Sequence, residues 1–175
     1  MVMMMYRYPV EREKYSKIIG DLRVRNIAEI LKNDFGFMVN INTVETNRLD
    51  LVAWFKGTTF AEKPYLAAEI INWKYDYELT DINRKDSMIR NLTQYEYKRR
   101  WLITSFRRNI GSFISEFETY DIEIKEIGFQ TQPTHSNDIN FYEFFKARNE
   151  ANDKRPWNEE TRKILRQKIE SWLNE

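Results

Sequence analysis

Two acidic residues stand inside short apolar stretches of the sequence, where a charge is costly. Asp50 lies within RLDLVAWF and Glu69 within YLAAEIINW, and each stretch has the apolar content of a buried strand. A carboxylate in such a strand needs a partner, and a divalent cation is one of the few partners that satisfies two carboxylates together. The pair therefore predicts a metal site. The alternative for Glu69 is a buried ion pair with Arg25 or Lys74.

The charge balance offers no general attraction for a polyanion. The chain of 175 residues carries 28 basic and 27 acidic side chains, so any nucleic-acid site must be a local patch. Two basic runs flank one predicted strand, and at most one of them can line a site at one end of that strand. Solvated helix ends are the alternative explanation for both runs. The candidate nucleic-acid-binding residues are Lys98, Arg99 and Arg100 in one run, and Arg107 and Arg108 in the other.

Other features of the composition exclude whole classes of site. The sequence has no cysteine, which excludes disulfides, thiolate metal sites and cysteine nucleophiles. No stretch approaches the roughly 20 apolar residues of a membrane span, and the Met-rich start is too briefly apolar for a signal peptide. We therefore expect a cytoplasmic, intracellular protein with no membrane partner. Aromatic residues make up 15% of the chain, which suits either a dense core or a base-stacking surface.

Hydrophobic periodicity predicts a single α/β domain, with a core over residues 1–130 and a helical C-terminal extension over 131–175 packed on it. Gly36 is expected to end the first helix, and Asp81 or Asp86 to cap the second. The strand that contains Glu69 should be central, because neither of its faces is polar. Strands separated by a helix should be parallel neighbours. The predicted helices are 10–33, 81–98, 107–119, 139–149 and 158–173, and the predicted strands are 37–44, 49–55, 65–73, 100–105 and 122–129.

This order of elements, with an acid in the second strand and another in the third, resembles the PD-(D/E)XK nuclease superfamily. Within it the chain is most similar to archaeal Holliday junction resolvases and related small archaeal or viral nucleases. The resemblance covers about residues 20–129. RLDLVAW stands where that family has its acid-containing second strand, with Leu49 in place of a proline, and AAEIINWK stands where it has acid, spacer and lysine.

The resemblance implies a restriction-endonuclease-like mixed sheet flanked by helices, and a hydrolase that cleaves DNA phosphodiester bonds. Asp50 and Glu69 would hold Mg²⁺ or Mn²⁺, the metal would lower the pKa of a bound water, and Lys74 would position or activate that water. DNA is the implied partner. The helical tail is either a lid over the core or the surface of a homodimer.

The third strand departs from the family pattern. In a regular strand Glu69 shares its face with Ile71 and Trp73, so Lys74 reaches the metal side only if a β-bulge shifts the phase by one residue. The other register makes Asn72, Trp73 and Lys74 the acid-spacer-lysine triplet, with Asn72 in place of the acid. We prefer the bulged register, because the other one leaves the charge of Glu69 on the opposite, helix-covered face.

Two helices supply further candidate catalytic residues. Many relatives carry a metal-binding glutamate in the first helix, where this chain has Arg25, with Glu29 one turn further along the same side. Gln94 lies where some relatives carry a glutamine that faces the site. Arg25 beside the two carboxylates could also replace the metal with an ion pair. The alternative function is therefore an inactive nuclease-fold protein that binds nucleic acid or a protein partner.

Overall fold

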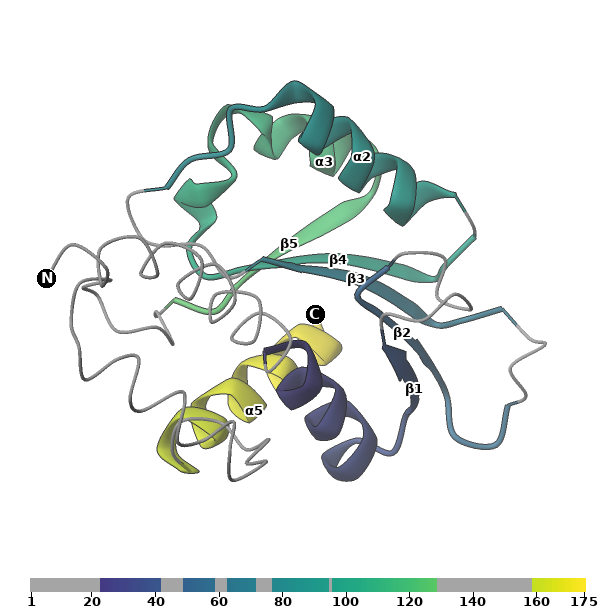
Figure 1. Ribbon diagram of the computed structural model, residues 1–175. Coiled ribbons are helices and arrows are strands. Elements are labelled where there is room, and N and C mark those ends of the chain that lie inside the picture. The colour runs from purple at the N-terminus through teal and green to yellow at the C-terminus, as the bar shows by residue number, and fades with distance from the viewer. Residues whose placement is uncertain (1–22, 42–48, 59–62, 72–76, 95, 129–158) are drawn as a thin grey trace, which may run out of the picture.

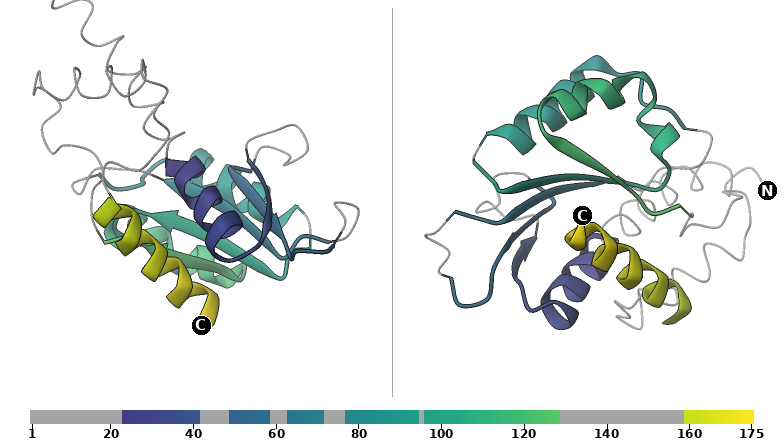
Figure 2. Two further views of the ribbon diagram at one scale, coloured as in Figure 1. Left: turned by 90° about the horizontal axis from the view of Figure 1, so that it is seen from below. Right: turned by 180° about the vertical axis from the view of Figure 1, so that it is seen from behind.

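The computed structural model describes residues 23–41, 49–58, 63–71, 77–94, 96–128 and 159–175. These residues form three layers, with one sheet between two pairs of helices (Figure 1). Helices α2 (Ile82–Thr93) and α3 (Ile114–Thr119) cover one face, while the helix over 23–34 and α5 (Glu159–Asn174) cover the other (Figure 2). The expected α/β architecture, a sheet flanked by helices with a C-terminal helix, is confirmed.

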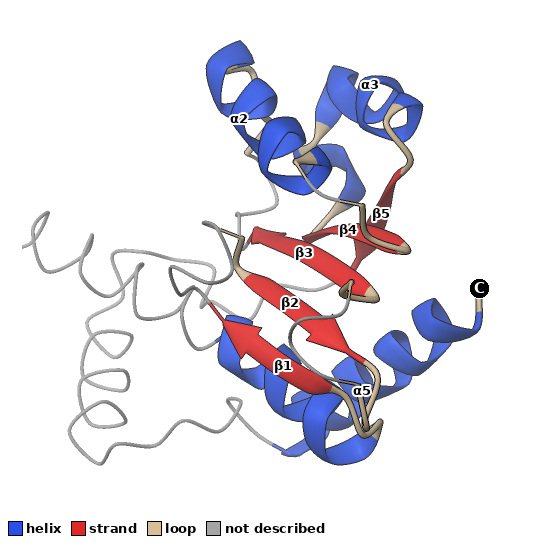
Figure 3. Ribbon diagram, turned by 90° about the vertical axis from the view of Figure 1, so that its right-hand side faces the viewer, coloured by secondary structure: helices blue, strands red, loops and turns tan. Residues whose placement is uncertain are grey.

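The five strands lie in the order β1-β2-β3-β4-β5 (Figure 3). The pairs β1/β2 and β2/β3 are antiparallel, and the pairs β3/β4 and β4/β5 are parallel. The sheet is therefore mixed, β3 is central, and the strands joined through helices are parallel neighbours, as predicted. The strands are β1 (Met38–Ile41), β2 (Leu51–Trp54), β3 (Leu66–Ile71), β4 (Arg99–Thr104) and β5 (Ile122–Glu126).

Each face of the sheet has its own apolar core, and β3 contributes to both. Leu66 and Ala68 belong to the core beneath α5 and the helix over 23–34. Ala67 and Ile71 belong to the core beneath α2 and α3. Since side chains alternate along a strand, Glu69 lies on the α2 face together with the second pair.

Local chemistry explains where the first two helices end and begin. The helix over 23–34 closes with a π-helical turn, η1 (Ile30–Asp34), and Gly36 adopts the predicted left-handed conformation with φ of 76°. Asp81 caps α2 by accepting hydrogen bonds from the backbone N–H groups of Asn83 at 2.9 Å and Arg84 at 3.3 Å. Helix α2 ends at Thr93, so the prediction that it extends to residue 98 was wrong.

The segment after β4 also differs from the prediction of one helix over 107–119. Two 3₁₀ turns, η3 (Arg107–Asn109) and η4 (Gly111–Phe113), precede the short α3. The buried Asn109 side chain accepts from the Phe106 backbone N–H at 3.0 Å and donates to the Tyr77 carbonyl. These side-chain bonds compete with helical hydrogen bonding, which explains the tighter, interrupted turns.

The C-terminal helix α5 completes the core on its side of the sheet. Its Leu165, Ile169 and Trp172 are buried against that core, and the Trp172 ring meets Trp101 of β4 edge-on, with centroids 5.7 Å apart. The predicted helix over 139–149 and the residues of the predicted strands beyond Ile41 and Ile71 lie outside the described residues. Among the helices that are described, none is long and apolar enough to cross a membrane.

Candidate functional site

Strand pairing brings the two predicted acids together. Leu51 of β2 pairs with Ala68 of β3, and continuing this antiparallel register by one residue places Asp50 opposite Glu69. The Ile70 backbone N–H donates a hydrogen bond of 2.8 Å to Oδ2 of Asp50, and the carboxyl groups of Asp50 and Glu69 are hydrogen-bonded to each other. The two acids therefore form one half-buried pair at one end of the sheet.

Burial is the main reason that the pKa of Glu69 rises to about 9. The charge of Asp50 and its hydrogen bond raise the Glu69 pKa further, while a hydrogen bond from Asn91 and the charge of Arg84 act in the opposite direction. Two neighbouring carboxyl groups repel each other when both are ionised, so a raised pKa means that one of them keeps its proton. The pair consequently shares a proton at neutral pH, in a place where two oxygen ligands converge.

Helix α2 supplies the polar residues that face this pair. Nδ2 of Asn91 donates to Oε1 of Glu69 at 3.3 Å. Arg84 lies two helical turns earlier, on the same side of α2, with the buried Met88 between them. Sequence reasoning missed both polar residues. The signal that could have identified them is their helical spacing around an apolar residue on the face that packs on the sheet.

Gln94 lies on the predicted helix, but another residue of that helix donates to Glu69. The donor is Asn91, whereas Gln94 is exposed and its Nε2 donates to the Asn91 carbonyl at 3.0 Å. Gln94 therefore stabilises the C-terminal end of α2. The order of elements located the helix correctly, but helical periodicity alone does not say which turn lies over the acids.

The structure places the two first-helix candidates away from the acid pair. Arg25 and Glu29 are both exposed, on a helix that covers the sheet face opposite to Glu69. The basic group that acts on the pKa of Glu69 is Arg84. The contacts of the described residues thus give no support to Glu29 as a ligand or to an ion pair between Arg25 and Glu69.

The register of the third strand is settled only as far as Ile71. From Leu66 to Ile71 each residue of β3 pairs in sequence with one of β4, so this part of the strand has no bulge. Asn72 and Lys74 lie outside the described residues. Their phase relative to Glu69 stays a prediction.

The two basic runs lie at opposite ends of β4, as predicted. Glu69 pairs with Leu102 and Ile71 with Thr104, so the acids lie near the carboxyl ends of β3 and β4. Arg107 and Arg108 are exposed and follow β4 at that same end, although Arg107 also pairs with Glu118 at 2.8 Å. The run with Lys98 lies at the far end. Only the Arg107–Arg108 run is positioned to extend the acid site.

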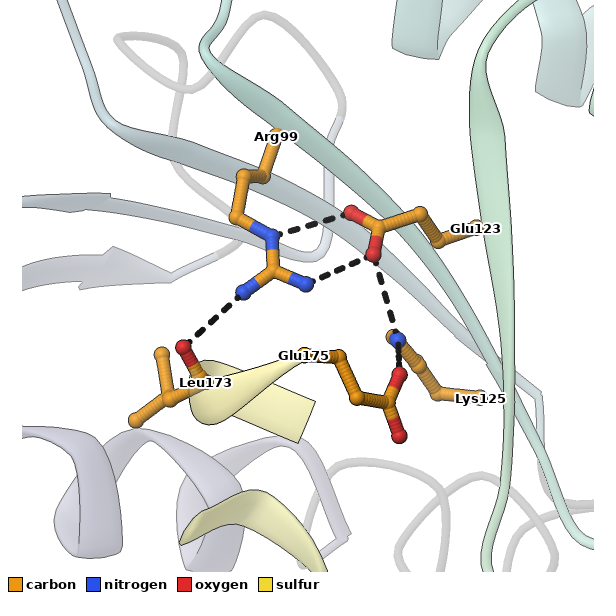
Figure 4. A network of polar contacts seen from close by, with 5 residues as sticks. All are labelled: Arg99, Glu123, Lys125, Leu173 and Glu175. Carbon is orange, nitrogen blue, oxygen red and sulfur yellow. Dashed lines mark hydrogen bonds and ion pairs between the residues drawn. The ribbon is translucent and has the colours of Figure 1, made fainter. Parts of the chain in front are cut away.

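Arg99 forms contacts within the fold, and its role in binding nucleic acid stays a prediction. Its guanidinium holds both oxygens of Glu123, at 2.6 and 3.0 Å, and donates to the Leu173 carbonyl at the end of α5 (Figure 4). Lys125 joins Glu123 at 3.2 Å and also pairs with Glu175. This network attaches α5 to the sheet.

The remaining residues of the run have separate roles. Nε of Arg100 donates to the Leu92 carbonyl at 2.9 Å, which satisfies an end carbonyl of α2. Lys98 is exposed, with its ammonium 5.8 Å from the centre of the Tyr65 ring. Of the three predicted residues in this run, Lys98 is exposed, whereas Arg99 and Arg100 are half-buried.

The acid pair fits a hard divalent cation by ligand type. Its donors are oxygens only, and Mg²⁺ is commonly held by one or two carboxylates, with waters and substrate phosphates completing its coordination. Among the described residues, no group of three or more His, Cys, Asp or Glu side chains is placed to hold a metal. A cation at this site would therefore take most of its ligands from water and from a phosphate.

No protein-family model, curated protein or solved structure matches this chain. The geometry of the acid pair and the order of the strands are thus what any assignment of function must rest on.

Proposed function

We propose that this protein is a metal-dependent nuclease that hydrolyses DNA phosphodiester bonds, with Asp50 and Glu69 as ligands of Mg²⁺ or Mn²⁺. The observation that carries the proposal is the contact between these two carboxyl groups, which neighbouring strands bring to one end of the sheet. The order of elements supports it: a helix, three antiparallel strands, a crossover helix and a parallel strand is what the resemblance to PD-(D/E)XK nucleases implies.

The residues around the pair have distinct roles in this proposal. A cation bound there lowers the pKa of a coordinated water and stabilises charge that develops on the phosphate. The Ile70 N–H fixes the Asp50 carboxylate, and Asn91 fixes Glu69, so both ligands are oriented before substrate binds. Arg84 contributes positive charge above the acids, where a scissile phosphate needs it. Lys74 keeps the water-activating role that the resemblance implies.

A second function is favoured by one specific observation. The described residues bring only two carboxylates together, and Arg84 already supplies part of the positive charge that a cation would supply. An inactive nuclease-fold protein would bind nucleic acid or a protein partner through this same face. The two functions differ in whether DNA that is bound at this face is cleaved when a divalent metal is present.

Cleavage of linear, supercoiled and branched DNA in Mg²⁺, Mn²⁺ or EDTA tests the proposal. The variants are Asp50→Asn and Glu69→Gln, which each replace a carboxyl ligand by an amide at nearly constant volume. Glu123→Gln is the matched control, because it removes a strand glutamate on the other face of the same sheet. We expect metal-dependent cleavage by the wild type and the control only. Cleavage in EDTA, or full activity in Glu69→Gln, would contradict the proposal.

A further inference from the structure

Three aromatic rings meet at the end of the sheet far from the acid pair. The ring centroids of Phe37 and Phe55 are 5.5 Å apart, those of Phe37 and Tyr65 are 5.9 Å apart, and those of Phe55 and Tyr65 are 4.3 Å apart. We call these three residues the aromatic cluster. Strand pairing produces it, because Met38 pairs with Trp54, which places Phe37 opposite Phe55 when the register is continued.

The cluster fixes one ring in an exposed position. Phe37 is buried and Tyr65 half-buried, yet 50% of Phe55 is exposed. Phe55 follows β2 directly and is held by the two rings beneath it, so its orientation is set in advance. A rigid, half-exposed aromatic ring can stack with a planar apolar group at little cost in side-chain entropy.

Lysines lie in the segments next to the aromatic cluster. Lys98 lies over Tyr65 and directly precedes β4, which runs beside β3 with Arg99 paired to Leu66. Lys56 is exposed in the turn that follows Phe55, and the exposed Lys63 lies before Tyr65. Among the described residues of these segments, the acid is Glu96, and it pairs with Lys63. In the part of the chain that the structure describes, Lys56 and Lys98 thus give the segments around the cluster an excess of positive charge.

We propose that the aromatic cluster and Lys98 bind an unpaired base and the adjoining phosphate of single-stranded DNA. Bases of any sequence stack on aromatic side chains, and lysines at such sites hold the backbone. Charge complementarity favours this occupant over an apolar peptide, which would gain nothing from the lysines. The inference rests on the proposed nuclease function and extends it, because it names a single-stranded segment as part of the preferred substrate.

The cluster is separate from the cleavage site. Phe55 lies about 16 Å along β2 from Asp50, at roughly 3.3 Å per residue. The buried ring of Phe37 belongs to the core on the α5 side of the sheet, while Glu69 faces α2. A base bound at the cluster would therefore belong to a single-stranded flank, away from the scissile phosphate. Its loss should weaken binding without changing the chemical step.

Fluorescence anisotropy with labelled oligothymidylate, in EDTA, tests the site without any cleavage. Phe55→Ala should weaken binding of the oligonucleotide by about ten-fold, the effect expected for one lost base stack. The matched control is Tyr120→Ala, which removes a ring that is 48% exposed on the other side of the fold and should leave affinity unchanged. Blunt duplex DNA should bind both variants and the wild type equally.

Two further variants keep the test decisive. Phe55→Leu preserves an apolar side chain, so it should fold as the wild type does by circular dichroism and still lose affinity. Lys98→Gln should reduce the salt dependence of binding by about one phosphate contact. Unchanged affinity in folded Phe55→Leu would overturn the proposal. So would a change confined to the oligomeric state, measured by sedimentation, because it would identify the cluster as a protein–protein surface.

The base-binding site and the proposed nuclease function can fail independently of each other. If Asp50→Asn and Glu69→Gln cleave normally while Phe55→Ala loses oligothymidylate binding, the nuclease assignment fails and the base-binding site stands. If cleavage requires both acids but Phe55 has no effect on binding or on KM, the nuclease stands and the base-binding site fails.

Discussion

Two strand glutamates on opposite faces of one sheet have opposite electrostatic surroundings. Glu69 on the α2 side contacts another acid, and burial and Asp50 raise its pKa well above the ordinary value. Glu123 on the α5 side is partly buried too, which opposes its ionisation, but hydrogen bonds from Arg99 and Lys125 outweigh that effect and lower its pKa. Similar side chains in similar strands are thus neutralised in different ways.

The difference separates a structural site from a candidate functional one. At Glu123 the fold supplies two cations and uses the network to hold the end of α5 (Figure 4). At Glu69 the fold brings a second acid instead of a cation, and a shared proton neutralises one of the two carboxylates. A buried acid that is hydrogen-bonded to a second acid is the arrangement expected where binding or catalysis needs it.

The largest expected effect is on cleavage. Glu69→Ala should lower the DNA cleavage rate by about 10³-fold or more, because losing a metal ligand removes several kcal/mol of transition-state stabilisation. Glu123→Ala should retain most activity at a temperature where it stays folded. Single-turnover rates of the two variants, measured under one set of conditions, make the comparison. Equal losses in both would show that the acid pair has no special role in catalysis.

The second largest effect is expected on the pH dependence of stability, which should have opposite signs for Glu69 and Glu123. The folded-state pKa of Glu69 is raised, so its contribution to stability is full below the unfolded value and is lost as pH rises toward about 9. The pKa of Glu123 is lowered, so its contribution is present above the unfolded value and is lost as pH falls through the acid range.

Urea unfolding across both pH ranges measures these contributions. Glu69→Gln should remove the loss of stability on the alkaline side, and Glu123→Gln should weaken the loss on the acid side. A Glu69→Gln variant with the wild-type alkaline profile would mean that the pair does not share a proton in the folded state.

Removing the Arg99 guanidinium, which neutralises Glu123 at the structural site, should destabilise the protein. Arg99→Met leaves Glu123 with one partner fewer and frees the Leu173 carbonyl, which we expect to cost about 2 kcal/mol of unfolding free energy. The corresponding change at the other site, Glu69→Gln, should be neutral or stabilising at about pH 8. Denaturant midpoints give both values. Destabilisation by both changes would remove the contrast between the sites.

The smallest effect should come from the residue that orients Glu69. Asn91→Ala should lower kcat by about ten-fold with little change in KM, since it acts through the ligand and does not touch DNA. Gln94→Ala, three residues along the same helix, is the control and should leave kcat unchanged. A larger loss in Gln94→Ala would show that the family position, not the observed contact, identifies the positioning residue.

The sequence predicts the sheet and the acid pair well because their signals are local. Alternation and apolar runs locate the five strands, and a carboxylate such as Glu69 amid apolar residues predicts a partner close in space. Strand order follows from helix crossovers, which place β3, β4 and β5 in parallel. The contact of Asp50 with Glu69 needs only the pairing of two strands that are close in the sequence.

The residues that the sequence did not predict depend on contacts between distant parts of the chain. Arg99 appeared to be part of a surface basic run, but its partners are 24 residues away at Glu123 and 74 residues away at Leu173. Asn91 was missed because the side of α2 that meets the acids is fixed by how the crossover packs. Helical periodicity gives the buried face and does not say which of its turns covers Glu69.

Calorimetric titration with Mn²⁺ tests most directly whether the acid pair is a metal site. We expect the wild type and Glu123→Gln to bind Mn²⁺ and, in buffers of different ionisation enthalpy, to release about one proton, because the metal replaces the proton that Asp50 and Glu69 share. Glu69→Gln should bind far more weakly and release none. Binding of equal strength in Glu69→Gln, or no binding by the wild type, would contradict the account.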